Sequence, residues 1–342
     1  MSEVTPYQAN VQLVNDRSKV DCLKYPKIDA HVHLGGRYRS EQYWKKYDLS
    51  DVISKLRNLG MVHIIDLELF TKRHWDFALE RTAPYRDFIS LCAPIDFDYI
   101  NDEKFESIVC DEMHYYHENG ACGFKIWKNL GLSVKKDDGT LYSLNDTKLK
   151  FIWKEAAALK MPIIIHVGDP PAFWEPVNIK NERYFELKSN PKWSYYNSNI
   201  KYDDLLKQLE LLLQENPETR FVVAHMCSAP HDLTYVSNLL NKFDNLYIDM
   251  AAVLSELGRQ PRSFEKFANT YSDRILFGTD YFAGDELPHI PYFRFMETAD
   301  EYFPYTPDGT YTQGAWNIYG CKLKENVLRK IYYENAKLIF NI

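Results

Sequence analysis

Eight short apolar runs rich in Val, Ile and Phe, most of them separated by stretches with helical periodicity, constrain the fold of this chain more than any other feature. Such alternation predicts βα units and a parallel sheet. Eight similar units close naturally into a barrel, whereas open doubly wound sheets usually have fewer strands and a Gly-rich phosphate-binding turn. We therefore predict an α/β protein with a (β/α)8 TIM barrel as a single domain over residues 1–342. The expected strands are Lys27 to His33, Met61 to Leu67, Phe88 to Ile95, Cys122 to Trp127, Pro162 to His166, Arg220 to His225, Asn245 to Met250 and Arg274 to Asp280.

The remaining segments are assigned to helices, an extension and loops. Helices are expected at 48–60, at 145–160 with Asn145 or Asp146 as N-cap, at 201–216, at 262–272 and from about Lys324 to Leu338, the last packed on the outside. Residues 1–26 form an N-terminal extension near the bottom face. The long connections 168–199 and 281–321 follow strand C-termini, where barrels of this type build their active sites, so we expect both to line one. A surface insertion or an oligomer contact is the alternative.

The charge balance argues against two classes of partner. The formal net charge is −7, and the chain has no Lys/Arg-rich run, so binding to nucleic acid or to anionic membranes is not expected. The N-terminus lacks a secretory pattern, and no segment approaches the roughly 20 apolar residues of a membrane span. The six cysteines contain no CxxC pair and are expected to be reduced core residues. A cytoplasmic enzyme fits these features best.

Two histidines lie two residues apart in the first expected strand, within IDAHVHL. Alternate residues of a strand share a face, so His31 and His33 point the same way, about 7 Å apart along the strand, a span that one metal ion can bridge. Asp29 is expected on this face, one layer deeper, as a buried partner that orients a histidine or a backbone group. The residues expected to face the helices are Ile28, Ala30 and Val32.

Three further apolar strands end in residues that bind metals: His166 after PIII, His225 after FVVA and Asp280 after RILFGT. An apolar core does not require imidazole or carboxylate groups at strand ends. Imidazoles with one carboxylate suit Zn²⁺, Mn²⁺ or Fe²⁺. We predict one divalent metal, Zn²⁺ first with Mn²⁺ or Fe²⁺ as alternatives, held by His31, His33, His166 and Asp280.

A metal with an open coordination position lowers the pKa of a bound water and polarises a carbonyl group. Asp280 is expected both to bind the metal and to accept the proton of that water. His225 is expected to bind the metal or to donate a hydrogen bond to an oxygen that develops negative charge.

These motifs resemble the amidohydrolase superfamily, in particular its amidohydrolase 2 branch. The resemblance lies in IDAHVHL, IIIHVGD, VVAHM and LFGTDYF and covers essentially the whole chain. It implies a (β/α)8 fold with a metal among His31, His33, His166 and Asp280, and His225 as ligand or catalytic residue. The branch includes lactonases, amidases, decarboxylases of aromatic or unsaturated acids and hydratases, so the reaction stays open.

Lys125 in the fourth expected strand, GFKIWKNLG, has three interpretations. Many binuclear members of the superfamily carry a carboxylated lysine on this strand as a bridge between two metals. Lys125 could instead bind a substrate carboxylate or oxyanion as an ammonium group, or form a structural ion pair. Because the branch in question is usually mononuclear, one metal is expected.

Candidate substrate contacts are Lys125, Trp174, Arg259 and Tyr281, with Glu175 and Arg183 as further loop residues. An arginine near a metal suits an anionic substrate. Weaker candidates are the carboxylates at the ends of other strands, Glu68, Asp96 and Asp249. Of these, Asp249 is interpreted as structural. The remaining histidines are assigned no role: His63, His74, His114, His117, His231 and His289.

The leading hypothesis is hydrolysis of a lactone, amide or ester of a small, anionic carboxylic acid by metal-activated water. A metal-dependent lyase that removes CO₂ or water from an aromatic or unsaturated acid is the alternative, and a non-enzymatic metal-binding scaffold is the third. The aromatic content of 15% is compatible with a homodimer contact.

Overall fold

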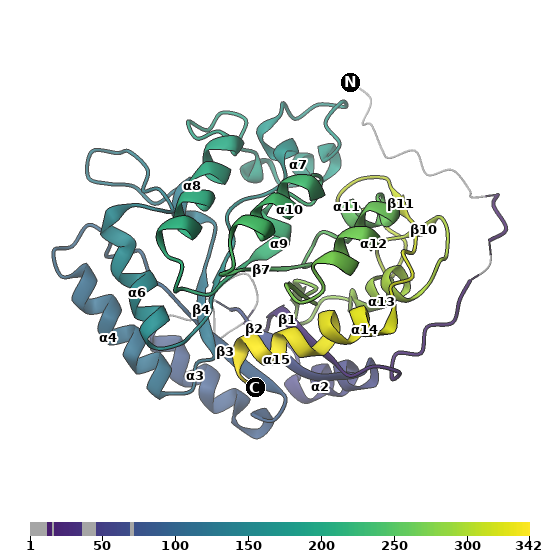
Figure 1. Cartoon of the computed structure of the whole chain (residues 1–342), viewed down its shortest axis with the longest axis horizontal. Coiled ribbons are helices and arrows are strands. Elements are labelled where there is room, and N and C mark those ends of the chain that lie inside the picture. The colour runs from purple at the N-terminus through teal and green to yellow at the C-terminus, as the bar shows by residue number, and fades with distance from the viewer. Residues whose placement is uncertain (1–11, 16, 36–45, 69–71) are drawn as a thin grey trace.

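The chain folds around one parallel sheet whose strands neighbour one another in sequence order, β8-β7-β6-β5-β4-β3-β2-β1-β9. The computed structural model describes residues 12–15, 17–35, 46–68 and 72–342. Figure 1 shows the strands at the centre of the molecule with helices around them. The strands are β1 (Lys27–His33), β2 (Met61–Asp66), β3 (Ile89–Pro94), β4 (Gly123–Ile126), β5 (Ile163–Ile165), β6 (Phe221–Val223), β7 (Leu246–Asp249), β8 (Ile275–Leu276) and β9 (Tyr281–Phe282).

The segment from β8 to β9 closes the barrel. β8 pairs with β7, and β9 pairs with β1, both in parallel. Between them, the Phe277 carbonyl accepts a 2.9 Å hydrogen bond from the Ala30 amide. Of the expected eighth strand, Arg274 to Asp280, only Ile275–Leu276 is a strand, and the piece that pairs with β1 begins just after its predicted end, at Tyr281. The predicted (β/α)8 barrel is confirmed.

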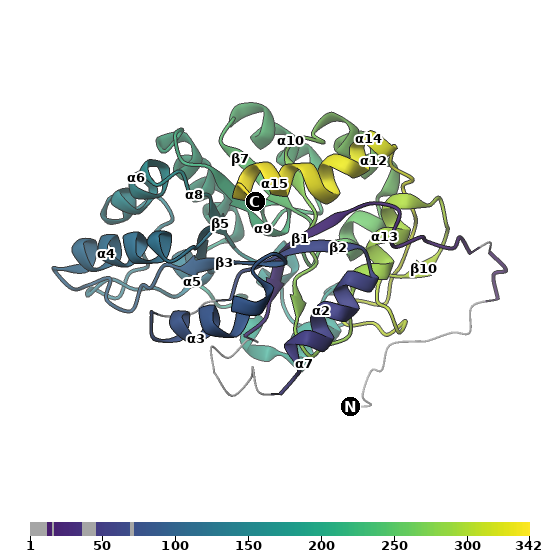
Figure 2. The ribbon, with the colours of Figure 1, turned by 90° about the horizontal axis from the view of Figure 1, so that it is seen from below.

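Helices surround the sheet (Figure 2). They are α2 (Leu49–Asn58), α3 (Lys72–Thr82), α4 (Phe105–Glu118), α5 (Asn129–Leu132), α6 (Lys150–Ala158), α7 (Tyr184–Ser189), α8 (Tyr202–Glu215), α9 (Ala224–Cys227), α10 (Leu233–Lys242), α11 (Leu254–Gly258), α12 (Pro261–Thr270), α13 (His289–Glu297), α14 (Glu325–Arg329) and α15 (Asn335–Phe340). Shorter helical turns are η1 (Ala83–Tyr85), η2 (Thr147–Leu149), η3 (Pro171–Trp174), η4 (Pro191–Trp193) and η5 (Lys330–Glu334), and β10 (Phe303–Pro304) pairs with β11 (Asn317–Ile318).

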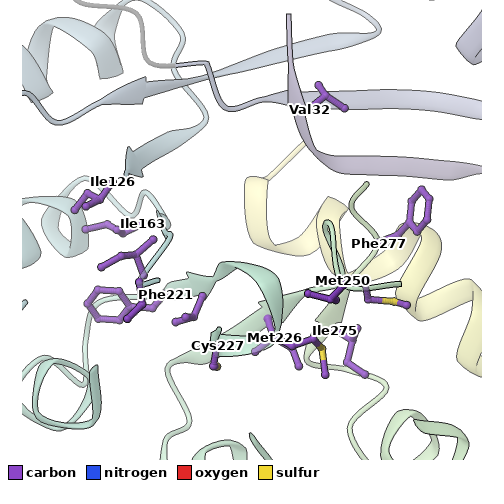
Figure 3. Packing of buried hydrophobic residues seen from close by; sticks show 14 of the residues in the cluster. Val32, Ile126, Ile163, Phe221, Met226, Cys227, Met250, Ile275 and Phe277 are labelled. Atoms are coloured by element: carbon purple, nitrogen blue, oxygen red, sulfur yellow. The ribbon is translucent and has the colours of Figure 1, made fainter. Parts of the chain in front are cut away.

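Two apolar layers flank the strands. The outer layer joins strand residues such as Ile163 and Phe221 to the helices (Figure 3). The inner layer contains the residues between them, including Ile164 and Val222, together with Ala336, Ile339 and Phe340 of α15. Because α15 packs against the inner layer, it covers one end of the barrel rather than only the outside.

β1 does not keep the simple alternation that the sequence suggests. Val32 belongs to the outer layer, but Ile28 and Ala30 belong to the inner one. A register shift in the pairing with β2, between Asp29 and Val32, breaks the two-residue period. The expectation that all three apolar residues face the helices is therefore wrong for Ile28 and Ala30.

The chain before β1 reaches the starts of the first two strands. The Lys27 ammonium donates a 2.7 Å hydrogen bond to the Cys22 carbonyl, and a Cβ on Gly60 would lie 2.2 Å from the same oxygen. Further upstream, the Ser18 hydroxyl donates to the Asp300 carboxylate over 2.6 Å. Among the described residues, no helix combines the length and the apolar character needed to cross a bilayer.

Candidate metal centre

Two histidines of β1 and the carboxylate that follows β8 converge at the C-terminal rim of the barrel. Asp280 Oδ1 lies 3.2 Å from His33 Nε2 and 3.4 Å from His31 Nε2. One ligand atom from each residue lies within 4.8 Å of the other two. We call His31, His33 and Asp280 the ligand cluster. The structure thus brings together three of the four residues expected to hold a metal.

The turn between β8 and β9 allows this close approach. A Cβ on Gly278 would lie 2.9 Å from His31 Cβ, so only glycine fits there without displacing the histidine. Asp280 adopts a left-handed φ of 62°, a conformation that Asp tolerates better than most residues. Its amide donates a 2.9 Å hydrogen bond to the His31 carbonyl, which fixes the carboxylate beside β1.

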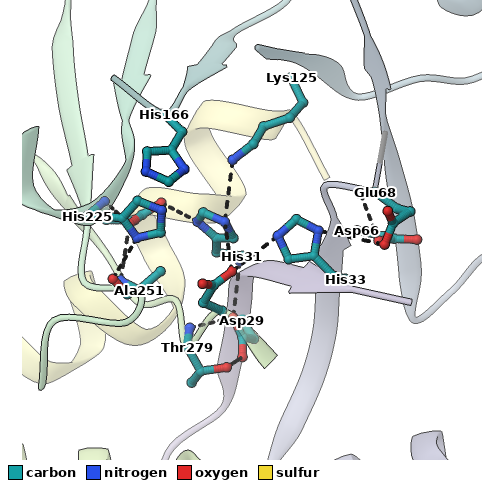
Figure 4. Close-up of polar contacts among 12 residues, drawn as sticks. Asp29, His31, His33, Asp66, Glu68, Lys125, His166, His225, Ala251 and Thr279 are labelled. Atoms are coloured by element: carbon teal, nitrogen blue, oxygen red, sulfur yellow. Dashed lines mark hydrogen bonds and ion pairs between the residues drawn. The ribbon is translucent and has the colours of Figure 1, made fainter. Parts of the chain in front are cut away.

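His31 also belongs to a second, deeper group with His225 and Asp249, whose ligand atoms again lie within 4.8 Å of one another. Asp249 Oδ2 is 2.8 Å from His31 Nδ1, and Asp249 Oδ1 accepts a 2.8 Å hydrogen bond from the His225 amide. Figure 4 shows His31 between His33 on one side and His225 on the other. A single carboxylate therefore contacts two of the histidines singled out by the sequence.

His225 is presented by an unusual backbone. His225, Met226, Cys227 and Ser228 all have φ between 53° and 59°, so α9 continues as a left-handed turn. Left-handed helical geometry costs L-residues about 1 to 2 kcal/mol each. The turn is held at both ends, because the Asp249 carboxylate accepts from the His225 amide and Tyr202 donates to the Ser228 carbonyl over 2.9 Å. Nothing in the sequence FVVAHMCSA signals it, since no glycine occurs there.

His166 lies beside His225 and outside both groups. Their ring centroids are 4.2 Å apart. His166 Nε2 is 3.2 Å from the Gly168 carbonyl oxygen and 3.8 Å from Asp169 Oδ1. Its role as a metal ligand stays a prediction.

Lys125 points to the same histidines from β4. Its ammonium nitrogen lies 3.4 Å from His31 Nε2, and the side chain is buried (Figure 4). Burial lowers the pKa of Lys125, while the nearby carboxylates of Asp249 and Asp280 act in the opposite direction. The three interpretations of this residue all remain predictions.

The protonation states suit metal binding. Burial, reinforced by the charge of Lys125, lowers the pKa of His31 to about 4. Burial also lowers the pKa of His33. Burial alone would raise the pKa of Asp280, but the hydrogen bond from His33 and the charge of His31 hold it well below its usual range. Neutral imidazoles and an ionised carboxylate are the forms that ligate metals.

Two more buried carboxylates stand behind the ligand cluster. Glu68 Oε2 lies 3.8 Å from His33 Nδ1. Asp29 accepts hydrogen bonds from the Thr279 hydroxyl over 2.6 Å and lies 3.0 Å from Nε2 of His289 in α13. The expectation that Asp29 orients a histidine or a backbone group agrees with these contacts and with a 3.1 Å bond from the His31 amide.

Sequence reasoning missed His289 and treated Asp249 as merely structural. His289 is fully buried at the start of α13, yet its surrounding sequence, ELPHIPY, has no strand-end pattern. Asp249 does carry such a signal, because it ends the apolar strand LYID as Asp280 follows RILFGT.

The predicted substrate contacts are placed within or beside the long loops. The Trp174 indole N–H donates to the Ile200 carbonyl over 3.0 Å, and the Arg259 guanidinium donates to Glu182 over 3.0 Å. Tyr281 is buried in the outer layer, in the strand piece that pairs with β1. Their roles in binding substrate stay predictions.

Arg183 joins the two long loops. Its guanidinium forms an ion pair with the buried Glu256 and lies 5.6 Å from the ring centre of Trp316. Glu186 accepts a second charged hydrogen bond from Arg183 over 2.7 Å. The first loop is thereby fixed against both the segment after β7 and the second loop.

The fold and the site define a TIM-barrel protein with a histidine and carboxylate cluster at the strand C-termini. A family model described as amidohydrolase, Amidohydro_2, matches residues 77–342, and the chain belongs to this family. The matched stretch contains His166, His225 and Asp280, while His31 and His33 precede it. A search of curated proteins finds no match.

Solved structures share the fold at low identity. A 2,6-dihydroxybenzoate decarboxylase, complexed with 2,6-dihydroxybenzoate, is 16% identical with a TM-score of 0.60, over 93% of this chain and 100% of that chain. A 5-carboxyvanillate decarboxylase from Novosphingobium aromaticivorans, with bound manganese and 3-methoxy-4-hydroxy-5-nitrobenzoic acid, is 13% identical with a TM-score of 0.54, over 94% and 98%. A probable 2-pyrone-4,6-dicarboxylic acid hydrolase from Acinetobacter baumannii, with citric acid bound, is 14% identical with a TM-score of 0.50, over 92% and 99%.

Proposed function

We propose that this protein is a metal-dependent hydrolase that adds water to a lactone, amide or ester of a small, anionic carboxylic acid. The observation that carries the proposal is the convergence of His31, His33 and Asp280, whose ligand atoms lie within 4.8 Å of one another. Asp280 Oδ1 is 3.4 Å from His31 Nε2 and 3.2 Å from His33 Nε2. Two neutral imidazoles and one carboxylate suit Zn²⁺, with Mn²⁺ or Fe²⁺ as alternatives. His31, His33 and Asp280 would hold the ion, with His166 as a fourth ligand.

When bound, such an ion lowers the pKa of a water and polarises a carbonyl oxygen. Asp280 is the most accessible member of the ligand cluster, with 23% of its side chain exposed against 12% for His33 and 1% for His31. An ionised carboxylate at this position can accept the proton of the attacking water.

The tautomer of His225, on the inner side of the ligand cluster, determines what this residue can do. Its Nδ1 lies 2.8 Å from the Ala251 carbonyl oxygen. Because a carbonyl oxygen only accepts, Nδ1 carries the hydrogen, and Nε2 of the neutral ring keeps its lone pair. His225 can therefore bind the metal or take up a proton, and it donates from Nε2 only after it has been protonated.

Lys125 and the loops would bind the substrate. A buried amino group 3.4 Å from His31 Nε2 supports the interpretation of Lys125 as a donor to a carboxylate or oxyanion. The loops 168–199 and 281–321, joined through Arg183 and Trp316, would form walls of the site. Trp174 and Tyr281 on these walls, with Arg259 just after α11, remain the proposed substrate contacts.

A decarboxylase is the second candidate, because two structures that share this fold are decarboxylases of hydroxy-aromatic acids. The test incubates the Zn²⁺-loaded and Mn²⁺-loaded protein with a panel of lactones, esters, amides and hydroxy-aromatic acids. Formation of the carboxylic acid product, by liquid chromatography, and CO₂ release are measured in parallel. A hydrolase releases acid without CO₂, and His166→Ala abolishes that activity while the protein stays folded. CO₂ release from the aromatic acids would overturn the hydrolase in favour of the lyase.

A further inference from the structure

We propose that Asp249 is a positioning residue that sets two functional histidines at once: it fixes the ring of His31 with Nε2 toward the ligand cluster, and it anchors the left-handed turn that presents His225. The proposal deepens the proposed function and rests on it. Asp249 ends β7, has 1% of its side chain exposed, and uses both carboxylate oxygens.

The first contact sets the tautomer of His31. Asp249 Oδ2 is 2.8 Å from His31 Nδ1, and an ionised carboxylate only accepts hydrogen bonds. Nδ1 therefore carries the ring hydrogen. The lone pair of the neutral ring then resides on Nε2, the atom that faces Asp280 Oδ1 at 3.4 Å. A carboxylate behind a ligating histidine fixes ring orientation and raises ligand basicity.

The second contact supports the strained backbone. Asp249 Oδ1 accepts from the His225 amide over 2.8 Å and from the Ala251 amide over 3.1 Å. The Ala251 carbonyl in turn lies 2.8 Å from His225 Nδ1. The same carboxylate oxygen thus holds the first left-handed residue and the backbone unit that orients its ring.

This arrangement requires a carboxylate and not merely a polar group. In Asp249→Asn, the amide oxygen has to face the two backbone N–H groups, which only donate. The amide NH₂ group then faces His31 Nδ1. Since NH₂ only donates, Nδ1 has to become the acceptor, and the ring hydrogen moves to Nε2. The variant keeps the shape of the site but removes the Nε2 lone pair from the ligand cluster.

The experiment measures tautomer and metal affinity on the full-length chain. Two-bond ¹H–¹⁵N spectra of the metal-free protein report which nitrogen of His31 carries hydrogen, with His31→Gln for assignment. We expect Nδ1–H in the wild type and Nε2–H in Asp249→Asn. Titration with Zn²⁺ or Mn²⁺ alone should show a roughly 10- to 100-fold weaker Kd for the variant, the range typical for partners of ligating histidines.

Asp66→Asn is the matched control. Asp66 is also a buried carboxylate at the end of a strand, but its Oδ1 accepts 3.1 Å hydrogen bonds from the amides of Leu34 and Glu68. The same isosteric exchange there should leave the His31 tautomer unchanged and the Kd within about threefold.

Three results would overturn the inference: wild-type metal affinity in Asp249→Asn, an unchanged Nδ1–H tautomer in that variant, or an Nε2–H tautomer in the wild type. The last measurement does not require the variant to fold. If the wild type bound neither ion, the proposed function would fail, whereas the wild-type tautomer would still decide the role of Asp249.

Discussion

The inner and outer halves of the candidate site contain the same residue types but are fixed to different degrees. In the inner half, His31 and Asp249 are each 1% exposed and lie 2.8 Å apart. In the outer half, His33 is 12% exposed and lies 3.8 Å from Glu68, beyond hydrogen-bond range. The inner half is held by short hydrogen bonds that include backbone amides, while the outer half faces the rim. The comparison indicates that the inner half provides the geometry and the outer half provides access.

Removing a ligand from either half should have the largest effect. We expect His31→Ala and His33→Ala each to weaken Zn²⁺ binding by more than roughly 100-fold, since they remove ligand atoms and not only their partners. His31→Ala should also lower the free energy of unfolding by about 1–3 kcal/mol more than His33→Ala, because it leaves a buried Asp249 oxygen without its partner. Calorimetric titration and urea denaturation measure the two effects.

His114→Ala is the control, because His114 is a 51% exposed histidine of α4 that contacts Glu155. It should change neither quantity appreciably. Equal losses of stability in His31→Ala and His33→Ala would contradict the distinction between the two halves.

The carboxylates behind the two histidines should also differ in how much they support metal binding, with Asp249 contributing more than Glu68. We expect Glu68→Gln to weaken metal binding less than about tenfold, because 3.8 Å is too long for a hydrogen bond to His33 Nδ1. Asp249→Asn should weaken metal binding more than Glu68→Gln does, because it moves the ring hydrogen of His31 to Nε2. The pair is compared by Zn²⁺ titration at one pH. A larger loss in Glu68→Gln would show that the outer half is the better fixed one.

The pH dependence of stability measures how firmly the fold holds these imidazoles neutral. Burial lowers the folded-state pKa of His31 to about 4 and lowers that of His33. The unfolded chain takes up protons near pH 6.5, whereas the folded one does so only at lower pH. Stability is therefore fully present above about pH 6.5 and falls as the pH drops toward 4, by on the order of a few kcal/mol.

Urea denaturation of the metal-free protein between pH 8 and 4.5 measures this slope. His31→Ala should flatten it, because one of the titrating groups is gone. A stability that stays constant or increases between pH 7 and 5 would mean that these imidazoles are not held neutral by the fold.

The sequence predicted which strands and residues form this site, but it did not predict their local backbone conformation. Apolar runs ending in His166, His225 and Asp280 located the C-terminal rim because strand length and polarity are local properties. The register shift in β1 was not foreseeable, since it depends on how β1 pairs with β2 and not on the alternation within IDAHVHL. The left-handed turn at His225 was equally hidden, because L-residues adopt it only where tertiary contacts impose it.

The same distinction explains why the contacts of Asp249 could not be predicted from the sequence. A strand-end aspartate is visible in LYID, but its two contacts come from β1 and from the turn after β6. Whether such a carboxylate orients a histidine depends on the order of strands around the barrel. The residue can be identified from the sequence, but its partners are determined by the closed sheet.

The most direct test of the central claim is the position of a bound ion. The protein is loaded with Zn²⁺, its metal content is measured, and an anomalous scattering map is calculated from a crystal. We expect one ion per chain, with a peak at about 2.0–2.2 Å from His31 Nε2, His33 Nε2 and an Asp280 oxygen. A chain that binds no ion, or a peak elsewhere with these three side chains uncoordinated, would contradict the account.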